Sequence, residues 1–126
     1  MARYAGRIDR KMFGSISECI TTEEVIITEE QIQHIQERHP RDYERFVRYS
    51  AQILAAPDYI IEANKPHSAV LLKTIAEDGR IFKLVLRLRV LSDADDRKNA
   101  VITFMHIDEK DYARLLRNKK ILYKRV

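Results

Sequence analysis

The sequence predicts an α+β fold in which N-terminal helices pack on a four-stranded antiparallel sheet. Apolar residues recur at helical spacing through residues 28–55, whereas they alternate with polar residues between residues 58 and 107. Pro40 and Pro57 separate these segments, because a proline disfavours helical backbone in the residue before it. Helices followed by antiparallel strands are typical of the α+β class.

The first helix is expected from Thr28 to His39. The Thr28 hydroxyl can cap the first turn, and Gln31 three residues later completes a capping-box pattern. The proline that follows His39 should end the helix there. Upstream, FGSISECI (13–20) and EVIIT (24–28) predict an early strand or hairpin.

A second helix should run from about Asp42 to Ala55 with one face packed inward. That face comprises Tyr43, Phe46, Val47, Ser50, Ile53 and Leu54. Four alternating segments then predict strands at residues 58–64, 68–76, 80–90 and 99–107. Gly79 supplies the positive φ of a hairpin turn between the second and third of them. A short helix near Glu109–Arg117 and a basic tail complete the chain.

Length and composition predict one domain over residues 1–126, located in the cytoplasm. With 45% hydrophobic residues, the chain has the size of a domain with one core. The single Cys19 excludes an intramolecular disulfide, and no segment has the pattern of a signal peptide or the apolar length of a membrane span. The four histidines lack the spacings of zinc sites, so neither a metal nor a cofactor is expected.

The charge of the chain favours a polyanionic partner. There are 23 Lys and Arg against 19 Asp and Glu, which gives a net charge of +4. The charges are also segregated: residues 18–30 contain five acids and no base, whereas residues 109–126 contain seven bases and two acids. A basic segment of this kind can equally be solvated surface.

Two histidines stand out in the first predicted helix. On a helical wheel His39 shares the side of Ile32 and Ile35, whereas His34 and Arg38 point roughly the opposite way. His39 should therefore be partly buried beside the sheet, and His34 should lie at its rim. Histidine can transfer protons near neutral pH. His39 can also be a satisfied core histidine or a C-terminal helix cap.

The strand predicted at residues 80–90 presents a row of cations. Its core face comprises Phe82, Leu84, Leu86, Leu88 and Val90. Lys83, Arg87 and Arg89 share the other face, where their mutual repulsion favours water or a bound anion such as phosphate. A solvated sheet face explains the same pattern. In the next strand the Thr103 hydroxyl can bind a phosphate oxygen, although threonine is also a good strand former.

Together these segments resemble the phage- and mobile-element-associated branch of the barnase–EndoU–colicin–RelE (BECR) nucleases. The resemblance rests on HIQERHP, the helix ending ILAAPDYI, the basic strand FKLVLRLRV and the last strand NAVITFMHI, and it covers about residues 26–107. It implies metal-independent RNA cleavage on a sheet face by a helix histidine, a strand Lys or Arg and a late-strand Ser or Thr.

On this chain, the resemblance implies a catalytic set of His39, His34, Lys83, Arg87 and Thr103, with His39 preferred to His34. The cations expected to bind the substrate are Arg38, Arg89, Lys73 and Lys98.

The predicted function is therefore a metal-independent endoribonuclease, a toxin or mobile-element enzyme that cleaves tRNA or other RNA by attack of a 2′-OH. Its expected partners are RNA and an immunity or antitoxin protein, without a membrane. Two alternatives stay open: a catalytically inactive RNA-binding or regulatory module of the same fold, and a protein-interaction domain. The last predicts no salt-dependent RNA binding, because counterion release accompanies phosphate contacts.

Overall fold

The computed structural model describes residues 2–89 and 98–126, with the backbone alone for residues 15–19. It confirms the α+β class: within the described residues, three α-helices and a 3-10 helix accompany one seven-stranded sheet. The elements are β1 (Ala2–Arg7), η1 (Arg10–Cys19), β2 (Glu24–Thr28), α1 (Glu29–Arg38), α2 (Pro40–Ala55), β3 (Tyr59–Glu62), β4 (Ser68–Ile75), β5 (Arg80–Arg87), β6 (Asn99–Ile107), α3 (Glu109–Asn118) and β7 (Ile121–Lys124). None of the described helices is long and apolar enough to cross a membrane.

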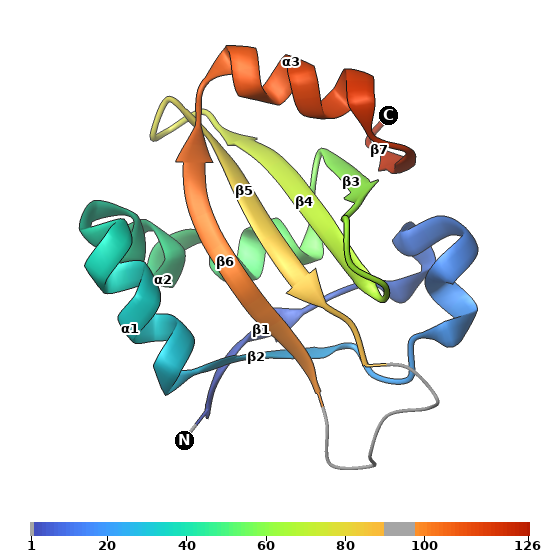
Figure 1. The fold of residues 1–126 in the computed structure, drawn as a ribbon, viewed down its shortest axis with the longest axis horizontal. Coiled ribbons are helices and arrows are strands. Elements are labelled where there is room, and N and C mark those ends of the chain that lie inside the picture. The colour runs from blue at the N-terminus through green and yellow to red at the C-terminus, as the bar shows by residue number, and fades with distance from the viewer. Residues whose placement is uncertain (1, 90–97) are drawn as a thin grey trace.

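The strands lie in the order β1-β2-β6-β5-β4-β3-β7, and each described pair is antiparallel except β2 and β6, which are parallel (Figure 1). The prediction of N-terminal helices on a four-stranded antiparallel sheet is therefore wrong in its details. The four predicted strands form β3 to β6, but β1 and β2 extend the sheet beyond β6. The basic tail forms β7, which pairs with β3.

The segment 13–20, predicted as a strand or hairpin, lies largely in η1, whereas EVIIT forms β2 as predicted. Gly14 forms a kink within η1, with a positive φ of 58° that glycine adopts readily. A Cβ at this position would lie 3.1 Å from the carbonyl oxygen of Leu122, so η1 packs closely on β7.

Gly6 allows β1 to approach α2. It lies where the pairing of β1 with β2 shifts register, and a Cβ there would lie 2.9 Å from Cδ1 of Leu54 and 3.1 Å from Cα of Ala51. We expect Gly6→Ala to lower the free energy of unfolding by about 1–3 kcal/mol, because overpacking displaces its neighbours. Gly79→Ala is the control: it also has a positive φ, but its Cβ would meet nothing within 4 Å. Urea unfolding measures both variants, and equal losses would contradict the role of the close approach.

One face of the sheet packs on α1 and α2. Phe82 of β5 stacks on Phe104 of β6 with ring centroids 5.2 Å apart, and Phe46 of α2 meets Phe104 edge-on at the same separation. The predicted inward face of α2 is wrong at Val47, whose side chain is 64% exposed, while Tyr49 is buried. Positions 46, 49, 50 and 53 form the stripe that faces the sheet, and Val47 lies outside it.

The helix α3 covers one end of the opposite face. A second apolar cluster joins the sheet to this helix through Ile61, Val70, Leu72, Leu115 and Leu116. Cavities lined by residues of β4, β5 and β6 remain on this face. Figure 1 shows that this part of the sheet lies between α1 and α3.

A β-bulge in β6 shapes this open face. Val85 pairs with Thr103, but Leu86 pairs with Val101, so Ile102 is the extra residue. The bulge leaves Ile102 40% exposed and keeps Thr103 on the same face as Val85.

Candidate active site

A cavity of about 310 Å³ lies between α1 and the edge of β6. Its lining residues are Gln31, His34, Ile35, Arg38, His39, Ile102, Thr103 and Met105. The described pairing of β2 with β6 involves only Asn99 and Ala100 of β6, and α1 packs beside the rest of that strand. The cavity therefore brings the HIQERHP segment together with the late strand.

The helix α1 begins and ends at the capping residues that the sequence predicted, Thr28 and His39. Thr28 caps the helix by accepting a hydrogen bond from a first-turn backbone amide at 3.2 Å. At the other end His39 donates its backbone N–H to the carbonyl oxygen of Ile35 at 2.7 Å. Ile32 and Ile35 are buried, which holds the helix against the core. Because Pro40 begins α2 at once, His39 occupies the corner between the two helices.

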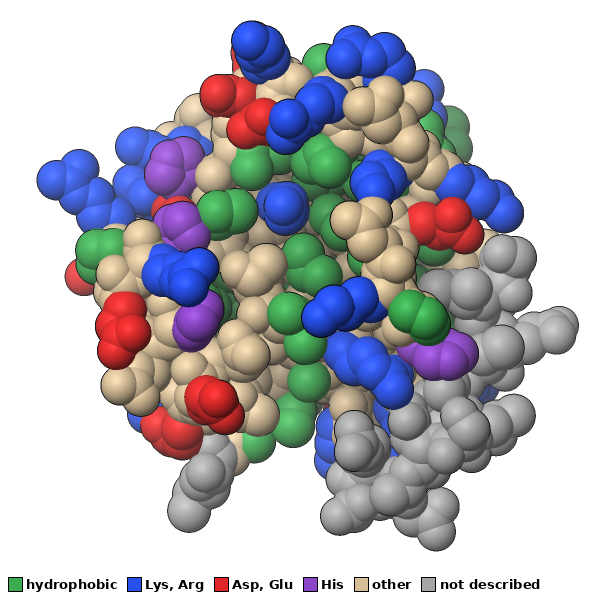
Figure 2. Space-filling model, in the orientation of Figure 1, with side chains coloured by type: hydrophobic (Ala, Val, Ile, Leu, Met, Phe, Trp, Pro, Cys, Tyr) green, Lys and Arg blue, Asp and Glu red, His purple; other side chains and the backbone are tan. Residues whose placement is uncertain are grey.

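Both histidines of this segment line the same cavity, which differs from the helical-wheel expectation. Residues 31, 34, 35 and 38 form one stripe along α1, between its buried and solvent-facing sides. His34 is exposed on this stripe, and His39 is half-buried. The backbone of His39 has left helical geometry at φ −139°, so the wheel does not predict the direction of its side chain. Figure 2 shows histidines gathered on the side of this face where α1 lies.

Lys83 and Arg87 lie on the open sheet face, as the alternation of β5 predicts. They line a larger cavity of about 620 Å³ whose other walls include the apolar Val85 and Leu115. Ile102 lines this cavity and the one beside α1, so the two are neighbours. Basic side chains are visible among hydrophobic ones over the middle of the face (Figure 2).

The prediction that Lys73 binds substrate places it on the wrong face. Lys73 pairs with Phe82 and shares its buried side of the sheet, and its side chain is 6% exposed. Its Nζ donates a hydrogen bond to the carbonyl oxygen of Ala56 at 2.7 Å. Because β4 is buried on both faces, its sequence does not alternate clearly enough to indicate this orientation.

Arg89 and Lys98 also line neither cavity. The guanidinium of Arg89 contacts the hydroxyl of Thr21, while Nζ of Lys98 lies 2.7 Å from the Glu24 carboxylate. Of the four cations predicted to bind substrate, Arg38 alone is brought to the histidines.

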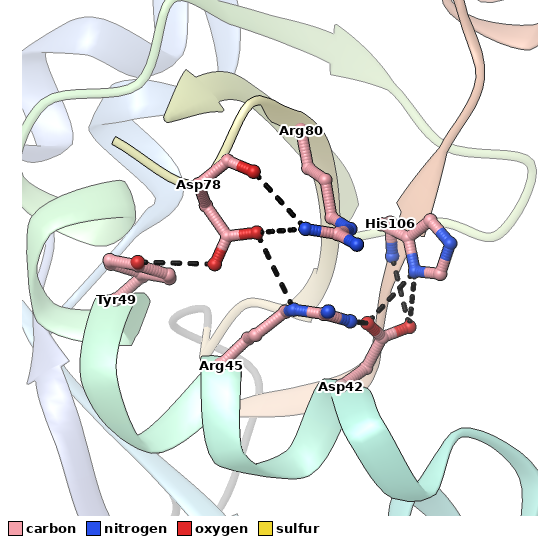
Figure 3. Close-up of polar contacts among 6 residues, drawn as sticks. All are labelled: Asp42, Arg45, Tyr49, Asp78, Arg80 and His106. Carbon is pink, nitrogen blue, oxygen red and sulfur yellow. Dashed lines mark hydrogen bonds and ion pairs between the residues drawn. The ribbon is translucent and has the colours of Figure 1, made fainter. Parts of the chain in front are cut away.

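The structure also contains an aspartate–histidine pair that was not predicted. Nδ1 of His106 lies 2.9 Å from both carboxylate oxygens of Asp42, which also accepts the His106 backbone N–H at 3.2 Å (Figure 3). Arg45 donates to the same carboxylate at 2.9 Å. Burial favours a raised pKa for Asp42, but these hydrogen bonds outweigh it and lower the pKa below its usual value.

This pair is part of a larger polar network. Arg45 also lies 3.5 Å from Asp78, which accepts hydrogen bonds from Arg80 and from the hydroxyl of Tyr49 (Figure 3). One signal for it was present in the sequence. In β6, His106 is two residues from the core residue Phe104, so both side chains point to the same face of the sheet and a partner for His106 could have been sought there. The identity of that partner, 64 residues away, was not available from periodicity.

Comparison with models of protein families shows which family the chain belongs to. The model of the family described as phage-Barnase-EndoU-ColicinE5/D-RelE like nuclease2 matches residues 5–124. The chain belongs to this nuclease family. The match extends beyond the 26–107 suggested by the resemblance, and it includes η1, β2 and β7 of the nuclease. No curated protein and no solved structure matches the chain.

The candidate active site of this nuclease thus contains His34, Arg38, His39 and Thr103 around one cavity, with Lys83 and Arg87 around the next. Among the described residues, no group of three or more His, Cys, Asp or Glu side chains is arranged to hold a metal ion.

Proposed function

We propose that this nuclease is a metal-independent endoribonuclease that acts at the cavity between α1 and β6. The observation that carries the proposal is the convergence of two histidines, an arginine and a threonine on this cavity in a member of a nuclease family. Histidines can serve as both base and acid, and an arginine supplies fixed positive charge to a phosphate.

The proposed reaction is transfer of the phosphate within RNA. His39 removes the proton from a ribose 2′-OH, and the resulting oxygen attacks the adjacent phosphorus. The bond from phosphorus to the 5′-oxygen of the next nucleotide breaks, and His34 protonates that oxygen. The products are a 2′,3′-cyclic phosphate and a free 5′-OH, so the substrate must carry a 2′-OH.

The cations of the site supply electrostatic stabilisation in this proposal. Arg38 lines the same cavity as the histidines. In the proposed reaction it binds the phosphate, whose charge increases in the transition state. The Thr103 hydroxyl can donate a hydrogen bond to the same phosphate. Lys83 and Arg87 extend the positive charge along the open sheet face.

Purified protein incubated with total RNA in the presence of EDTA tests the proposal. RNA should be cut to fragments with cyclic phosphate ends, whereas DNA of the same sequence should remain intact. A synthetic RNA methylated on every 2′-oxygen should bind without being cut. Loss of cleavage in EDTA, or cleavage of DNA, would contradict the proposed chemistry.

Lys83→Ala should reduce RNA cleavage by about tenfold or more, because a hydrogen bond to a charged group contributes about 1.5–3 kcal/mol. Its stability should change by no more than about 0.5 kcal/mol, because the side chain is off the core face. Lys11→Ala, which removes an exposed lysine of η1, is the matched control. Cleavage rates measured at subsaturating RNA compare the two, and equal rates would remove Lys83 from the site.

A second candidate function is RNA binding without cleavage. Within the described residues, no hydrogen bond of the His34 or His39 ring orients it as Asp42 orients His106. Such a module would keep salt-dependent RNA binding but give no products in the assay above.

As part of the nuclease proposal, cleavage in a cell would make the protein a toxin that needs an immunity or antitoxin partner. Growth arrest on expression, relieved by His39→Ala, tests that role.

A further inference from the structure

We propose that the pocket around His106 binds a second phosphate of the RNA, next to the phosphate that is cleaved. The identity of this ligand rests on the proposed ribonuclease function, whereas the site itself rests on the contacts described below. Its chemistry is that of a tetrahedral oxyanion.

The pocket adjoins the candidate active site. It has a volume of about 350 Å³ and is lined by Arg38, His39, Pro40, Arg41, Asp42, Arg45, Arg80 and His106. Arg38 and His39 also line the cavity between α1 and β6. A strand of RNA with one phosphate at the histidines of α1 can therefore place a neighbouring phosphate here.

The pocket has an excess of positive charge. Its guanidinium groups belong to Arg38, Arg41, Arg45 and Arg80. Asp42 is the carboxylate among the residues that line the pocket. Arg45 is paired with Asp42 and with Asp78, and Arg80 is paired with Asp78. Arg38 and Arg41 are exposed, and neither side chain has an ion pair or hydrogen bond to another residue in the described part of the chain. Their guanidinium groups remain to bind an anion.

His106 completes the pocket with an oriented ring. Because Nδ1 donates to the buried Asp42 carboxylate, the ring presents Nε2 on its other side (Figure 3). The side chain is 51% exposed, so a ligand can reach it. Arg38 and His39 of α1, Arg41 and Arg45 of α2, and Arg80 of β5 surround it. A protonated ring donates from Nε2 to an oxyanion, and the anion offsets the repulsion from the guanidinium groups.

The first arm of the test uses sulfate, whose charge does not change near neutral pH. Sodium sulfate is titrated into the parent protein at constant ionic strength, and the NMR signals of the His106 ring and the Arg41 amide are followed. We expect both signals to shift in a saturable way. The shift of the His106 ring should be lost in Arg41→Ala, the shift of the Arg41 amide should be lost in His106→Ala, and both should be retained in Lys11→Ala. Shifts that do not saturate, or that persist in both pocket variants, would overturn the site.

The second arm uses RNA methylated on its 2′-oxygens, which the proposed nuclease binds without cutting. Its affinity is measured against salt concentration, where each lost phosphate contact on a single strand lowers the logarithmic slope by about 0.7. Arg41→Ala should show this decrease and Lys11→Ala should not. An unchanged slope, even with sulfate bound, would exclude an RNA phosphate as the ligand.

The two arms also separate this inference from the proposed function. If the slope falls in Arg41→Ala but the parent cuts no RNA, the phosphate pocket stands and the ribonuclease assignment fails. If the parent cuts RNA and the slope does not change, the assignment stands and the pocket is refuted. Arg41 is exposed and unpaired within the described residues, so we expect its substitution to leave the fold intact.

Discussion

Replacing His39 with alanine should lower RNA cleavage by about 10²–10⁴-fold, the usual contribution of a positioned proton donor or acceptor. RNA binding should be retained, because phosphate affinity comes mainly from cations that remain in place. The expectation follows from the position of His39 at the corner of α1 and α2, half-buried in a cavity that it shares with Arg38 and Thr103. Single-turnover cleavage and binding of 2′-O-methyl RNA measure the two properties separately.

The matched variants are His34→Ala and His67→Asn. His34 lines the same cavity, so its loss should also impair cleavage, whereas His67 lines neither cavity of the candidate active site. Asparagine is chosen at residue 67 because the backbone there has a φ of 59°, which asparagine tolerates. If His34→Ala is inactive and His39→Ala retains activity, His34 carries the essential proton transfer. If His67→Asn loses as much activity as His39→Ala, the cavity is not the active site.

Asp42→Ala should lower the free energy of unfolding by about 1–3 kcal/mol, because it leaves the half-exposed His106 ring and the largely buried Arg45 guanidinium without this hydrogen-bond acceptor. Asp42 is 2% exposed and accepts hydrogen bonds from His106 and Arg45. The loss is measured by urea unfolding. Asp111→Ala is the control, because its ion pair with Arg114 is exposed and should contribute no more than about 1 kcal/mol. Similar losses in both variants would contradict a special role of the buried network.

The same network makes stability depend on pH. Folding lowers the pKa of Asp42, since its hydrogen bonds to His106 and Arg45 outweigh the effect of burial. Its contribution to stability is therefore fully present above the pKa of an unfolded aspartate, about 3.9, and is lost as the pH falls below that value through the lower pKa of the folded state. Asp42→Asn should remove this part of the acid dependence, and an unchanged acid profile would contradict it.

The elements that the sequence predicted correctly have local causes. The caps at Thr28 and His39 depend on residues within one or two turns, and the strands β3 to β6 depend on alternation along each segment. The cation face of β5 follows from the same alternation, so Lys83 and Arg87 were placed on the correct side of the sheet. The early segment 13–20 was misjudged. It packs on β7, which is distant in the sequence, so local patterns do not report its surroundings.

By itself the sequence determined the α+β class, the limits of α1, the end of α2, the resemblance to BECR nucleases and the residue types available for proton transfer. Only the tertiary structure decided which of those residues meet. It brought His34 beside His39, turned Lys73 toward the opposite face, and joined Asp42 to His106 across 64 residues. The physical reason is that periodicity is a local property, which gives the direction of a side chain relative to its own helix or strand. A site is formed by contacts between elements that are distant in the sequence. Those contacts depend on sheet order, on the bulge at Ile102 and on the packing of α1 beside β6.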